Sequence, residues 1–349
     1  MCLKGNELVV TSQMRGDKLS ARALWYDNPA HAELRAETLC YPEAGSATPM
    51  ALVATQWSAI SRGTERLVMS GKVPRSEYAR MRAPYQCGDF PFPVKYGYCT
   101  AGSVEEGPPE LTGRNVFVLH PHQDRFLVPA DRVCPFPEAL PPRRAPLAAN
   151  METALNAVWD SGAAPGDNIV VIGAGIVGLM ICYLCAGMPG AYVTAVDPQQ
   201  SRAPLARAFG AQFLLPEELG SRSGNSIGAD VVFHASATPA GLSSALRTAG
   251  MESRIVEVSW YGDEEVPIPL GAEFHSRRLQ LVSSQVGRVA PSRRQRWSHN
   301  RRLAKALDLL CDDRLDALIT DEFQFEDLPQ VLPDYLLGPE TGLAAVVRY

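Results

Sequence analysis

The chain has 349 residues, 46% of them hydrophobic and 20% charged, with a net charge of −5 at neutral pH. This length suffices for two domains with separate cores. The negative charge gives no general attraction to nucleic acid, and no apolar run reaches transmembrane length. Because the first residues also lack the apolar segment of a signal peptide, we expect a cytoplasmic protein that binds neither nucleic acid nor membranes.

The first part of the chain predicts short strands joined by turns. Runs of β-branched and aromatic residues favour strands, and they lie at 8–10, 22–26, 51–57, 116–122 and 125–129, with a loop running into a strand over 91–104. The segment 58–68 is predicted to start a helix in its second half. A proline-rich connector at 135–142 leads into a helix predicted over 145–159.

A glycine-rich turn between two apolar strands dominates the middle of the chain. The strand Ile169–Ile172 runs into GAGIVG at 173–178, followed by an apolar helix and a second strand over 191–196. Gly173 permits a tight turn, Gly175 lets the backbone approach a pyrophosphate, and Gly178 lets the helix pack against the sheet. The helix N-terminus offers free N–H groups to phosphates. This order of elements predicts a dinucleotide-binding unit.

Asp197 predicts which dinucleotide binds, because it stands at the end of the second strand. A carboxylate at that point accepts hydrogen bonds from a ribose 2′-hydroxyl and repels a 2′-phosphate. We therefore expect NAD as the cofactor rather than NADP.

The rest of the chain alternates helices and strands and then becomes basic. Helices are predicted at 201–209 and 240–249, and strands at 229–235, 254–259 and 279–284. This alternation is typical of a doubly wound α/β sheet. From 291 the chain is predicted to be basic and helical, and 343–349 is predicted to be a strand. We expect residues 1–155 and 291–349 to form one domain, into which the nucleotide-binding domain, 156–290, is inserted.

Three other patterns allow both a functional and a structural interpretation. Cys182 and Cys185 lie in the apolar helix after the glycine turn, where packing is favoured over redox or metal chemistry. His120 and His122 would point to one face of a strand. They could bind a metal or substrate, although hydrogen-bonded or solvent-exposed histidines are favoured. The basic run 288–302 could meet an anionic substrate, although a solvated helix face is favoured.

These motifs resemble the medium-chain dehydrogenase/reductase superfamily, which includes the zinc alcohol dehydrogenases, over nearly the whole chain. The resemblance implies an α/β fold with a GroES-like, β-rich catalytic domain and a doubly wound Rossmann domain. It also implies a small-molecule substrate and a homodimer that pairs sheet edges near 279–287. The segments 60–65, reading ISRGTE, and 96–98, reading YGY, look like the branch that contains the bacteriochlorophyllide hydroxyethyl dehydrogenase.

The chain departs from the zinc-binding members of this superfamily at the ligand positions. Ser61 stands where they have a cysteine, Tyr98 where they have a histidine, and Ala149 or Asn150 near their third ligand. No cysteine occurs between 102 and 116, where the structural zinc lobe would need four. Zinc requires thiolate, imidazole or carboxylate ligands, so we expect no metal. Only a regrouping in space could supply one, from Cys99, Glu65, Glu152, His120 and His122.

Without zinc, side chains must move the substrate proton. By its position, Tyr98 is a candidate to donate to a carbonyl oxygen or to accept an alcohol proton, although it could simply pack. Ser61 and Thr64 lie in the turn that supplies the family's proton-relay hydroxyl. As an alternative they cap the following helix, which is favoured for Thr64. Glu152 is a candidate base, but pairing with an arginine is favoured.

The resemblance also implies three further cofactor contacts. Arg62 would contact the pyrophosphate, Thr153 the nicotinamide, and Arg202 the region of the adenosine ribose. The predicted function is a zinc-independent NAD(H)-dependent oxidoreductase that interconverts a hydroxyl and a carbonyl group. Two alternatives stay open: a quinone or enoyl reductase, whose relatives mostly prefer NADPH, and a non-catalytic NAD(H)-binding redox sensor.

Overall fold

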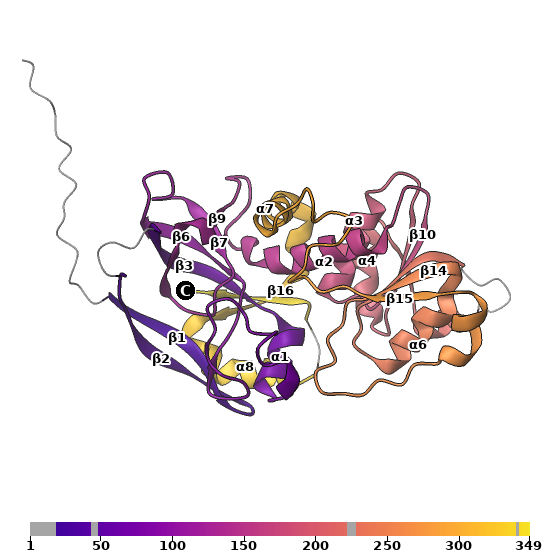
Figure 1. Cartoon of the computed structure of the whole chain (residues 1–349), viewed down its shortest axis with the longest axis horizontal. Helices are drawn as coiled ribbons and strands as arrows, with labels where there is room; N and C mark the ends of the chain where they lie inside the picture. Colours follow the sequence, from indigo (N-terminus) through magenta and orange to yellow (C-terminus); the bar gives the residue numbers. More distant parts are fainter. Residues whose placement is uncertain (1–18, 43–47, 222–227, 340–341) are drawn as a thin grey trace, which may run out of the picture.

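The computed structural model describes residues 19–42, 48–221, 228–339 and 342–349, so the strand predicted at 8–10 lies outside the described residues. Figure 1 shows two halves, one built mainly of strands and one of alternating strands and helices. The fold is α/β, with a GroES-like part and a Rossmann part, as predicted. Among the described helices, none has the length and apolar character needed to cross a bilayer.

The β-rich half contains two sheets. The four-stranded sheet has the order β2-β1-β5-β4, with β1 Leu19–Asn28, β2 His31–Leu39, β4 Cys87–Gly88 and β5 Val94–Lys95. The seven-stranded sheet has the order β16-β17-β3-β6-β7-β9, and β8 also pairs with β3. Its strands are β3 Met50–Ile60, β6 Thr100–Glu106, β7 Asn115–Val118, β8 Arg125–Pro129, β9 Cys134–Pro135, β16 Ile319–Gln324 and β17 Ala344–Arg348.

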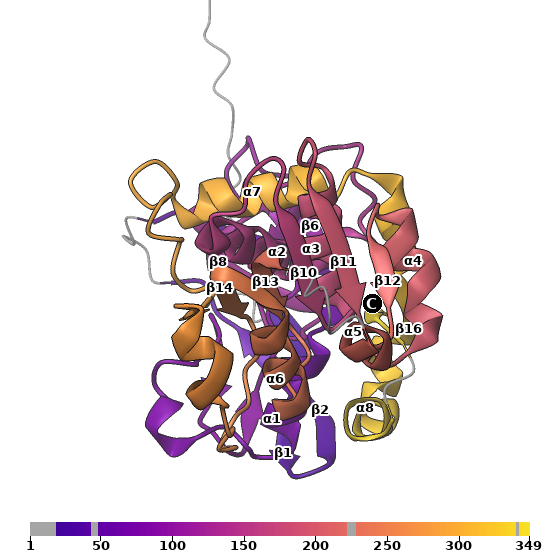
Figure 2. The same cartoon turned by 90° about the vertical axis from the view of Figure 1, so that its right-hand side faces the viewer.

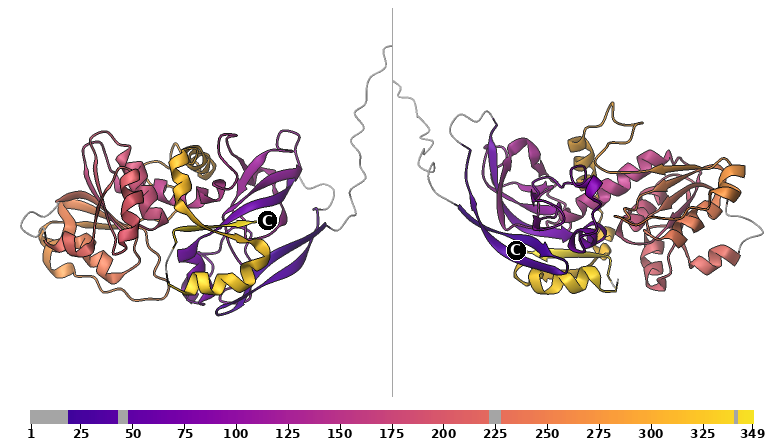
Figure 3. Two further views of the ribbon diagram at one scale, coloured as in Figure 1. Left: turned by 180° about the vertical axis from the view of Figure 1, so that it is seen from behind. Right: turned by 60° about the horizontal axis from the view of Figure 1, so that its bottom comes forward.

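The C-terminal segment returns to this β-rich half. Strand β17 pairs antiparallel with β3, and helix α8, Leu328–Leu337, packs against β2 and against α1, Arg62–Met69. Leu328, Leu332 and Leu336 recur every four residues on one face of α8, and all three are buried. Figure 3 shows this yellow segment lying against the β-rich half. The tail thus shares a core with the first part of the chain.

The other half contains a six-stranded sheet whose strands all run parallel, in the order β12-β11-β10-β13-β14-β15. They are β10 Asn168–Ile172, β11 Tyr192–Val196, β12 Gln212–Leu214, β13 Ala229–His234, β14 Ala249–Glu257 and β15 Gln280–Ser283. The helices beside them are α3 Ile176–Ala186, α4 Ala203–Ala208, α5 Pro216–Ser221 and α6 Pro239–Thr248. Figure 2 shows β12, β11, β10, β13 and β14 side by side. The strand order reverses between β10 and β13, and ligands bind at such a switch point.

Helices α2, Ala148–Ser161, and α7, His299–Leu309, lie between the two halves in Figure 1. Arg302 of α7 is buried and donates to Glu152 Oε1 at 2.8 Å and to Asn156 Oδ1 at 2.5 Å, both on α2. The predicted boundary between 155 and 156 falls inside α2. This helix therefore cannot be assigned to one half alone.

Most local predictions agree with these elements. The segments 22–26 and 51–57 lie in β1 and β3, and Cys182 and Cys185 are buried within α3, where they pack as predicted. The basic tail differs, because the chain turns over 291–296 before α7 begins. Ser298 then caps that helix by accepting a hydrogen bond from the Arg301 N–H at 3.1 Å. The prediction of a helix from 291 is therefore wrong in its starting point.

The turn after β10 requires glycine at positions 173 and 178. At a third glycine, Gly175, the missing side chain leaves open space. Gly173 has a φ of 102°, in the left-handed region that favours glycine. A Cβ on Gly178 would lie 1.9 Å from Gly173 O, whereas a Cβ on Gly175 would meet nothing within 4 Å. Gly175 precedes α3 with an ordinary φ of −72°. The turn is thus closed by Gly173 and Gly178 and open above Gly175.

We predict that Gly178→Ala destabilises the fold and that Gly175→Ala does not. The added methyl group at 178 collides with a backbone carbonyl, which costs about 3 kcal/mol, or roughly 6–12 °C in melting temperature. Gly175→Ala should keep the melting temperature within about 2 °C of wild type while weakening dinucleotide binding. Calorimetry measures both variants, and an unchanged melting temperature for Gly178→Ala would contradict this account of the turn.

Candidate active site

Three of the predicted site residues are brought together by the fold. Ser61 lies between β3 and α1, and Tyr98 lies between β5 and β6. Their side-chain oxygens hydrogen-bond to each other, and the Thr64 side chain lies close enough to act, like Ser61, to lower the pKa of Tyr98. Burial, with the Cys99 thiol beside it, raises the pKa of Tyr98 well above its usual value despite these two side chains. Tyr98 is therefore a neutral phenol that can donate a proton.

The start of α1 differs from the prediction for Thr64. The helix begins at Arg62, so Ser61 is the N-cap residue and Thr64 lies inside the first turn. The Ser61 hydroxyl makes no capping hydrogen bond. Instead, Glu65 Oε1 accepts a hydrogen bond from the Ser61 backbone N–H at 2.6 Å. The capping interpretation of Thr64 is wrong, because a neighbouring carboxylate satisfies the helix start and leaves both hydroxyls facing Tyr98.

The Glu65 side chain, on the first turn of α1, is fully buried. Besides the Ser61 N–H, it accepts hydrogen bonds from Tyr26 Oη at 2.7 Å and from His122 Nε2 at 3.1 Å. Burial alone would raise the pKa of Glu65, but His122 and the hydrogen-bond donors together hold it below its usual value. A buried carboxylate is tolerated only when it is paired in this way. Glu65 therefore stays ionised.

The hydrogen bonds continue from His122 to the last residue of the chain. His122 Nδ1 lies 2.8 Å from Ser58 Oγ, which lies 3.1 Å from Tyr349 Oη. The sequence analysis favours a solvent-exposed or hydrogen-bonded His122, and the structure shows it hydrogen-bonded but buried. The sequence analysis missed Tyr26, Ser58 and Tyr349. They come from three different strand segments, so no local spacing indicates their proximity.

The Asp197 side chain, at the end of β11, is hydrogen-bonded to the glycine turn. Its Oδ2 accepts a hydrogen bond from the Ala174 N–H and its Oδ1 from the Gln199 N–H, both at 2.8 Å. The N-cap of α3 is Gly175, which has no side chain to satisfy the first N–H groups of the helix. Such a helix start is suited to an anion.

Arg62 reaches from α1 toward the segment after α8. Its Nη2 donates to Gly338 O at 3.2 Å and to Pro339 O at 3.0 Å, and its guanidinium lies 5.1 Å from the Tyr335 ring. Its Nη1 is buried and has no hydrogen-bond partner within the described part of the chain. An unsatisfied, buried guanidinium nitrogen fits an anionic oxygen such as that of a pyrophosphate.

The remaining predicted residues make contacts within the protein. Glu152 pairs with Arg302, so the favoured pairing is the one observed, and no hydrogen bond in the described ranges joins it to Tyr98. Burial raises the pKa of Glu152 although Arg302 opposes this. The Thr153 hydroxyl donates to Ala149 O at 2.9 Å. Arg202 is buried and donates to Gly342 O at 2.7 Å.

Comparison with known proteins gives the same architecture. Residues 177–306 match the family model described as zinc-binding dehydrogenase. A putative zinc-binding dehydrogenase of Sinorhizobium meliloti, solved with NADP, superposes with a TM-score of 0.74 at 18% identity, over 95% of this chain and 100% of that one. A protein of Escherichia coli CFT073 described as a short chain alcohol dehydrogenase, solved with NADH, gives a TM-score of 0.75 at 17% identity, over 95% of this chain and 99% of that one. The chain has the fold of the alcohol dehydrogenase-like, medium-chain dehydrogenases.

Sequence similarity supports the zinc-binding dehydrogenase family within this fold. The D-guloside 3-dehydrogenase of Escherichia coli K12 is 29% identical over 210 residues, which make up 56% of this chain. The match spans 59% of the length of that enzyme.

The family description implies a catalytic zinc, but the residues present do not fit one. At the corresponding positions the Ser61 and Tyr98 hydroxyls bond to each other, and both are poor zinc ligands at neutral pH. The alternative ligands do not regroup, since Glu65 faces Tyr26 and His122, and Glu152 faces Arg302. Among the described residues, no three His, Cys, Asp or Glu side chains are placed to hold a metal ion.

His120 is also buried and serves packing. Its ring stacks on Phe126 with centroids 3.7 Å apart and on Tyr85 at 5.3 Å, and its Nδ1 lies 3.0 Å from Pro121 O. Of the interpretations of the two histidines, the hydrogen-bonded one is observed, although neither is solvent-exposed. Burial lowers the pKa of His120 to about 3.

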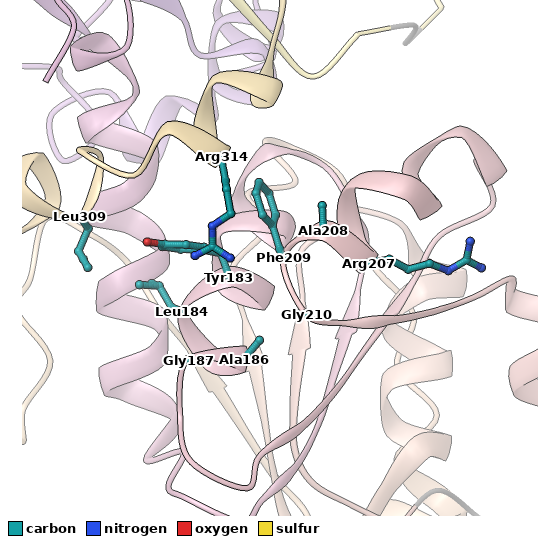
Figure 4. A pocket seen from close by; sticks show the side chains of 10 residues that line it. All are labelled: Tyr183, Leu184, Ala186, Gly187, Arg207, Ala208, Phe209, Gly210, Leu309 and Arg314. Atoms are coloured by element: carbon teal, nitrogen blue, oxygen red, sulfur yellow. The ribbon is translucent and has the colours of Figure 1, made fainter.

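A pocket of about 350 Å³ lies apart from these residues, between α3, α4 and the chain after α7 (Figure 4). Within it the Arg314 guanidinium lies 5.3 Å from the Tyr183 ring centroid and pairs with Asp312 at 2.6 Å. None of the predicted site residues lines it. Two arginines line the pocket, Arg207 and Arg314, and Arg314 is already paired with Asp312.

We predict that His120 makes the fold sensitive to acid. Since a free histidine titrates near 6.5 and folded His120 near 3, the unfolded chain binds a proton between these pH values that the folded chain does not. Stability is therefore lost as the pH falls from 6.5 toward 3, by about 2 kcal/mol between pH 6 and 4.5. His120→Phe keeps the stacking and should flatten this part of the melting-temperature profile.

The matched control is His275→Asn, which changes an exposed histidine. Melting temperatures measured from pH 7 to 4.5 should decline for this variant as they do for the wild type. An equally steep decline for His120→Phe would show that His120 does not carry the effect.

Proposed function

We propose that the protein is a zinc-independent, NAD(H)-dependent oxidoreductase that interconverts a hydroxyl and a carbonyl group on a small molecule. The observation that carries this proposal is the hydroxyl cluster of Ser61, Thr64 and Tyr98, in which Ser61 and Tyr98 stand where the resemblance places zinc ligands. These groups can donate and accept the proton that a metal would otherwise help to move.

The chemistry follows from the charge around Tyr98. In the reductive direction the neutral phenol donates its proton to the carbonyl oxygen and takes one from Ser61, to which it is hydrogen-bonded, while Ser61 takes one from water, so that no phenolate or alkoxide is left. The nicotinamide, when bound, supplies the hydride that completes the alcohol. The ionised Glu65 nearby disfavours a phenolate. In the oxidative direction the same hydroxyls relay the alcohol proton to water, and oxidised nicotinamide, when bound, would take the hydride.

The cofactor is held by groups on both sides of the glycine turn. The open space above Gly175 and the first N–H groups of α3 suit the pyrophosphate, and the unsatisfied Arg62 Nη1 supports the same placement. Asp197 would accept the ribose hydroxyls, Arg202 would lie near that ribose, and Thr153 would contact the nicotinamide.

The substrate class we propose is a polyhydroxylated alcohol or sugar derivative. Support comes from the similarity to D-guloside 3-dehydrogenase and from three neighbouring hydroxyls that can bind further substrate oxygens. The test is an NADH fluorescence assay of protein stripped of metal by chelation, against panels of polyols, glycosides, ketones, quinones and enoyl compounds. Turnover of alcohols or ketones without metal supports the proposal. Activity restored only by stoichiometric zinc, or confined to quinones and enoyl compounds, contradicts it, and no turnover at all favours a redox sensor.

The first prediction of this proposal concerns cofactor choice. Because the Asp197 carboxylate would repel a 2′-phosphate, NADH should bind at least about tenfold more tightly than NADPH, a difference of roughly 1.4 kcal/mol. Fluorescence titration of both cofactors measures it. Equal affinities, or tighter binding of NADPH, would refute the assignment.

The second prediction concerns the proton donor. Tyr98→Phe removes the hydroxyl that bonds to the reacting oxygen and should lower kcat about 100-fold, the low end for a general acid–base group, while the NADH affinity stays unchanged. Tyr96→Phe is the matched control, because Tyr96 is a buried tyrosine whose ring contacts Tyr98 edge-on. Its kcat should stay near the wild-type value, and unimpaired Tyr98→Phe would remove Tyr98 from the mechanism.

We also propose that the protein is a homodimer. Strand β15 is the edge of the six-stranded sheet and its side chains are partly exposed. Pairing this edge with that of a second copy would cover its unpaired backbone groups. Light scattering at micromolar concentration should give twice the mass of one chain, and a monomer mass would overturn the proposal.

A further inference from the structure

Ser236 lies at the carboxyl edge of the six-stranded sheet, beside the glycine turn. A Cβ on Gly173 would lie 2.8 Å from Ser236 N. The turn follows β10 and Asp197 follows β11, whereas β13 and β14 lie on the other side of β10. A dinucleotide bound at a switch point places one nucleotide on each side. The turn after β13 therefore faces the nucleotide that does not contact Asp197, which is the nicotinamide half.

A buried histidine and a carboxylate hold the Ser236 hydroxyl in this turn. His234, the last residue of β13, is fully buried, and its Nε2 lies 2.7 Å from Ser236 Oγ. Its Nδ1 lies 2.7 Å from Glu257 Oε2, at the end of β14. Gly241 of α6 leaves room for this arrangement, since a Cβ there would lie 2.2 Å from Ser236 Oγ. None of these contacts belongs to the proton-moving cluster around Tyr98.

The hydrogen bonds determine which way each proton points. Glu257 also accepts from the Ser259 N–H at 2.8 Å and from Tyr261 Oη at 3.3 Å, so it acts as an ionised acceptor and His234 Nδ1 carries a hydrogen. His234 Nε2 then accepts the Ser236 hydrogen.

The Thr238 hydroxyl supplies the other hydrogen that lies near Ser236 Oγ. Thr238 Oγ1 accepts from the Gly241 N–H at 3.1 Å, and because the Ser236 hydrogen points at His234, Thr238 is the donor in its 3.0 Å contact with Ser236 Oγ. Both hydrogens near Ser236 Oγ are thereby assigned. One lone pair of this oxygen stays available to a donor on a ligand.

A carboxylate, an imidazole and a hydroxyl are hydrogen-bonded in the same order in enzymes that use serine as a nucleophile. Here, however, two neighbouring backbone N–H groups already have hydrogen-bond acceptors. The Ala237 N–H donates to Ser259 Oγ at 3.0 Å, and the Gly241 N–H donates to Thr238. Acyl transfer needs such N–H groups to hold a developing oxyanion. The cluster is therefore built to orient a hydroxyl, not to attack an ester.

We propose that Ser236 binds a hydroxyl of the nicotinamide ribose as a hydrogen-bond acceptor, and that His234 and Glu257 are positioning residues that aim its lone pair at the cofactor. A sugar hydroxyl is the donor that the nicotinamide half presents, and a phosphate, which only accepts, does not fit this lone pair. The inference rests on the proposed function for the presence of a dinucleotide.

The test compares NADH with ADP, which lacks the nicotinamide nucleotide. Ser236→Ala should weaken NADH binding about fivefold, the loss of one neutral hydrogen bond, and leave the ADP affinity unchanged. His234→Gln should give a similar loss, and the double variant should bind NADH no more weakly than either single variant, because His234 acts through Ser236. Ser244→Ala, which changes another serine near the turn, is the control and should bind both ligands as the wild type does.

The outcomes separate this inference from the proposed function. Wild-type NADH and ADP binding with an unaffected Ser236→Ala variant overturns the inference and leaves the function standing. Equal weakening of NADH and ADP also overturns it, because it shows general damage to the domain. Wild-type protein that binds neither ligand overturns the proposed cofactor and, with it, this inference.

Discussion

The buried charge of Glu65 is the constraint on which the β-rich half depends. A carboxylate with no exposed surface must be matched by donors, and Glu65 receives them from Tyr26, the Ser61 N–H and His122. Satisfying this charge fixes the start of α1 and with it the Ser61 hydroxyl against Tyr98. The hydroxyls of the candidate site are thus placed by a buried ion.

The nucleotide-binding half could be predicted from the sequence because its signals are local. The turn 173–178 and Asp197 lie within one strand–helix–strand unit, and the clashes at Gly178 explain why those residue types are needed. Tyr98 and Ser61 were found only through their family positions. The hydrogen-bond network around Glu65 and His122 could not be predicted, because Tyr26, Ser58 and Tyr349 come together only in the folded sheets, and strand registers depend on the whole sheet.

Buried polar clusters connect elements in both halves, and each has a different consequence. Arg302 joins α7 to Glu152 and Asn156 on α2 and so ties the segment after the Rossmann sheet to the helix before it. His234 and Glu257 join the ends of β13 and β14. Such clusters stabilise little beyond the cost of burying them, but an incomplete one is strongly unfavourable. These clusters therefore select a single arrangement of the helices and strand ends that they join.

The pairing of β17 with β3 affects the order in which the protein can fold during synthesis. The six strands of the Rossmann sheet are contiguous between Asn168 and Ser283, so this sheet can assemble as soon as that stretch has left the ribosome. Strand β3 is made early but must wait for β17, which borders it in the finished sheet. In the interval β3 can pair with β6 and β8, but its residues 57–60 lack the partner that β17 supplies, so this end of the strand is open to mispairing.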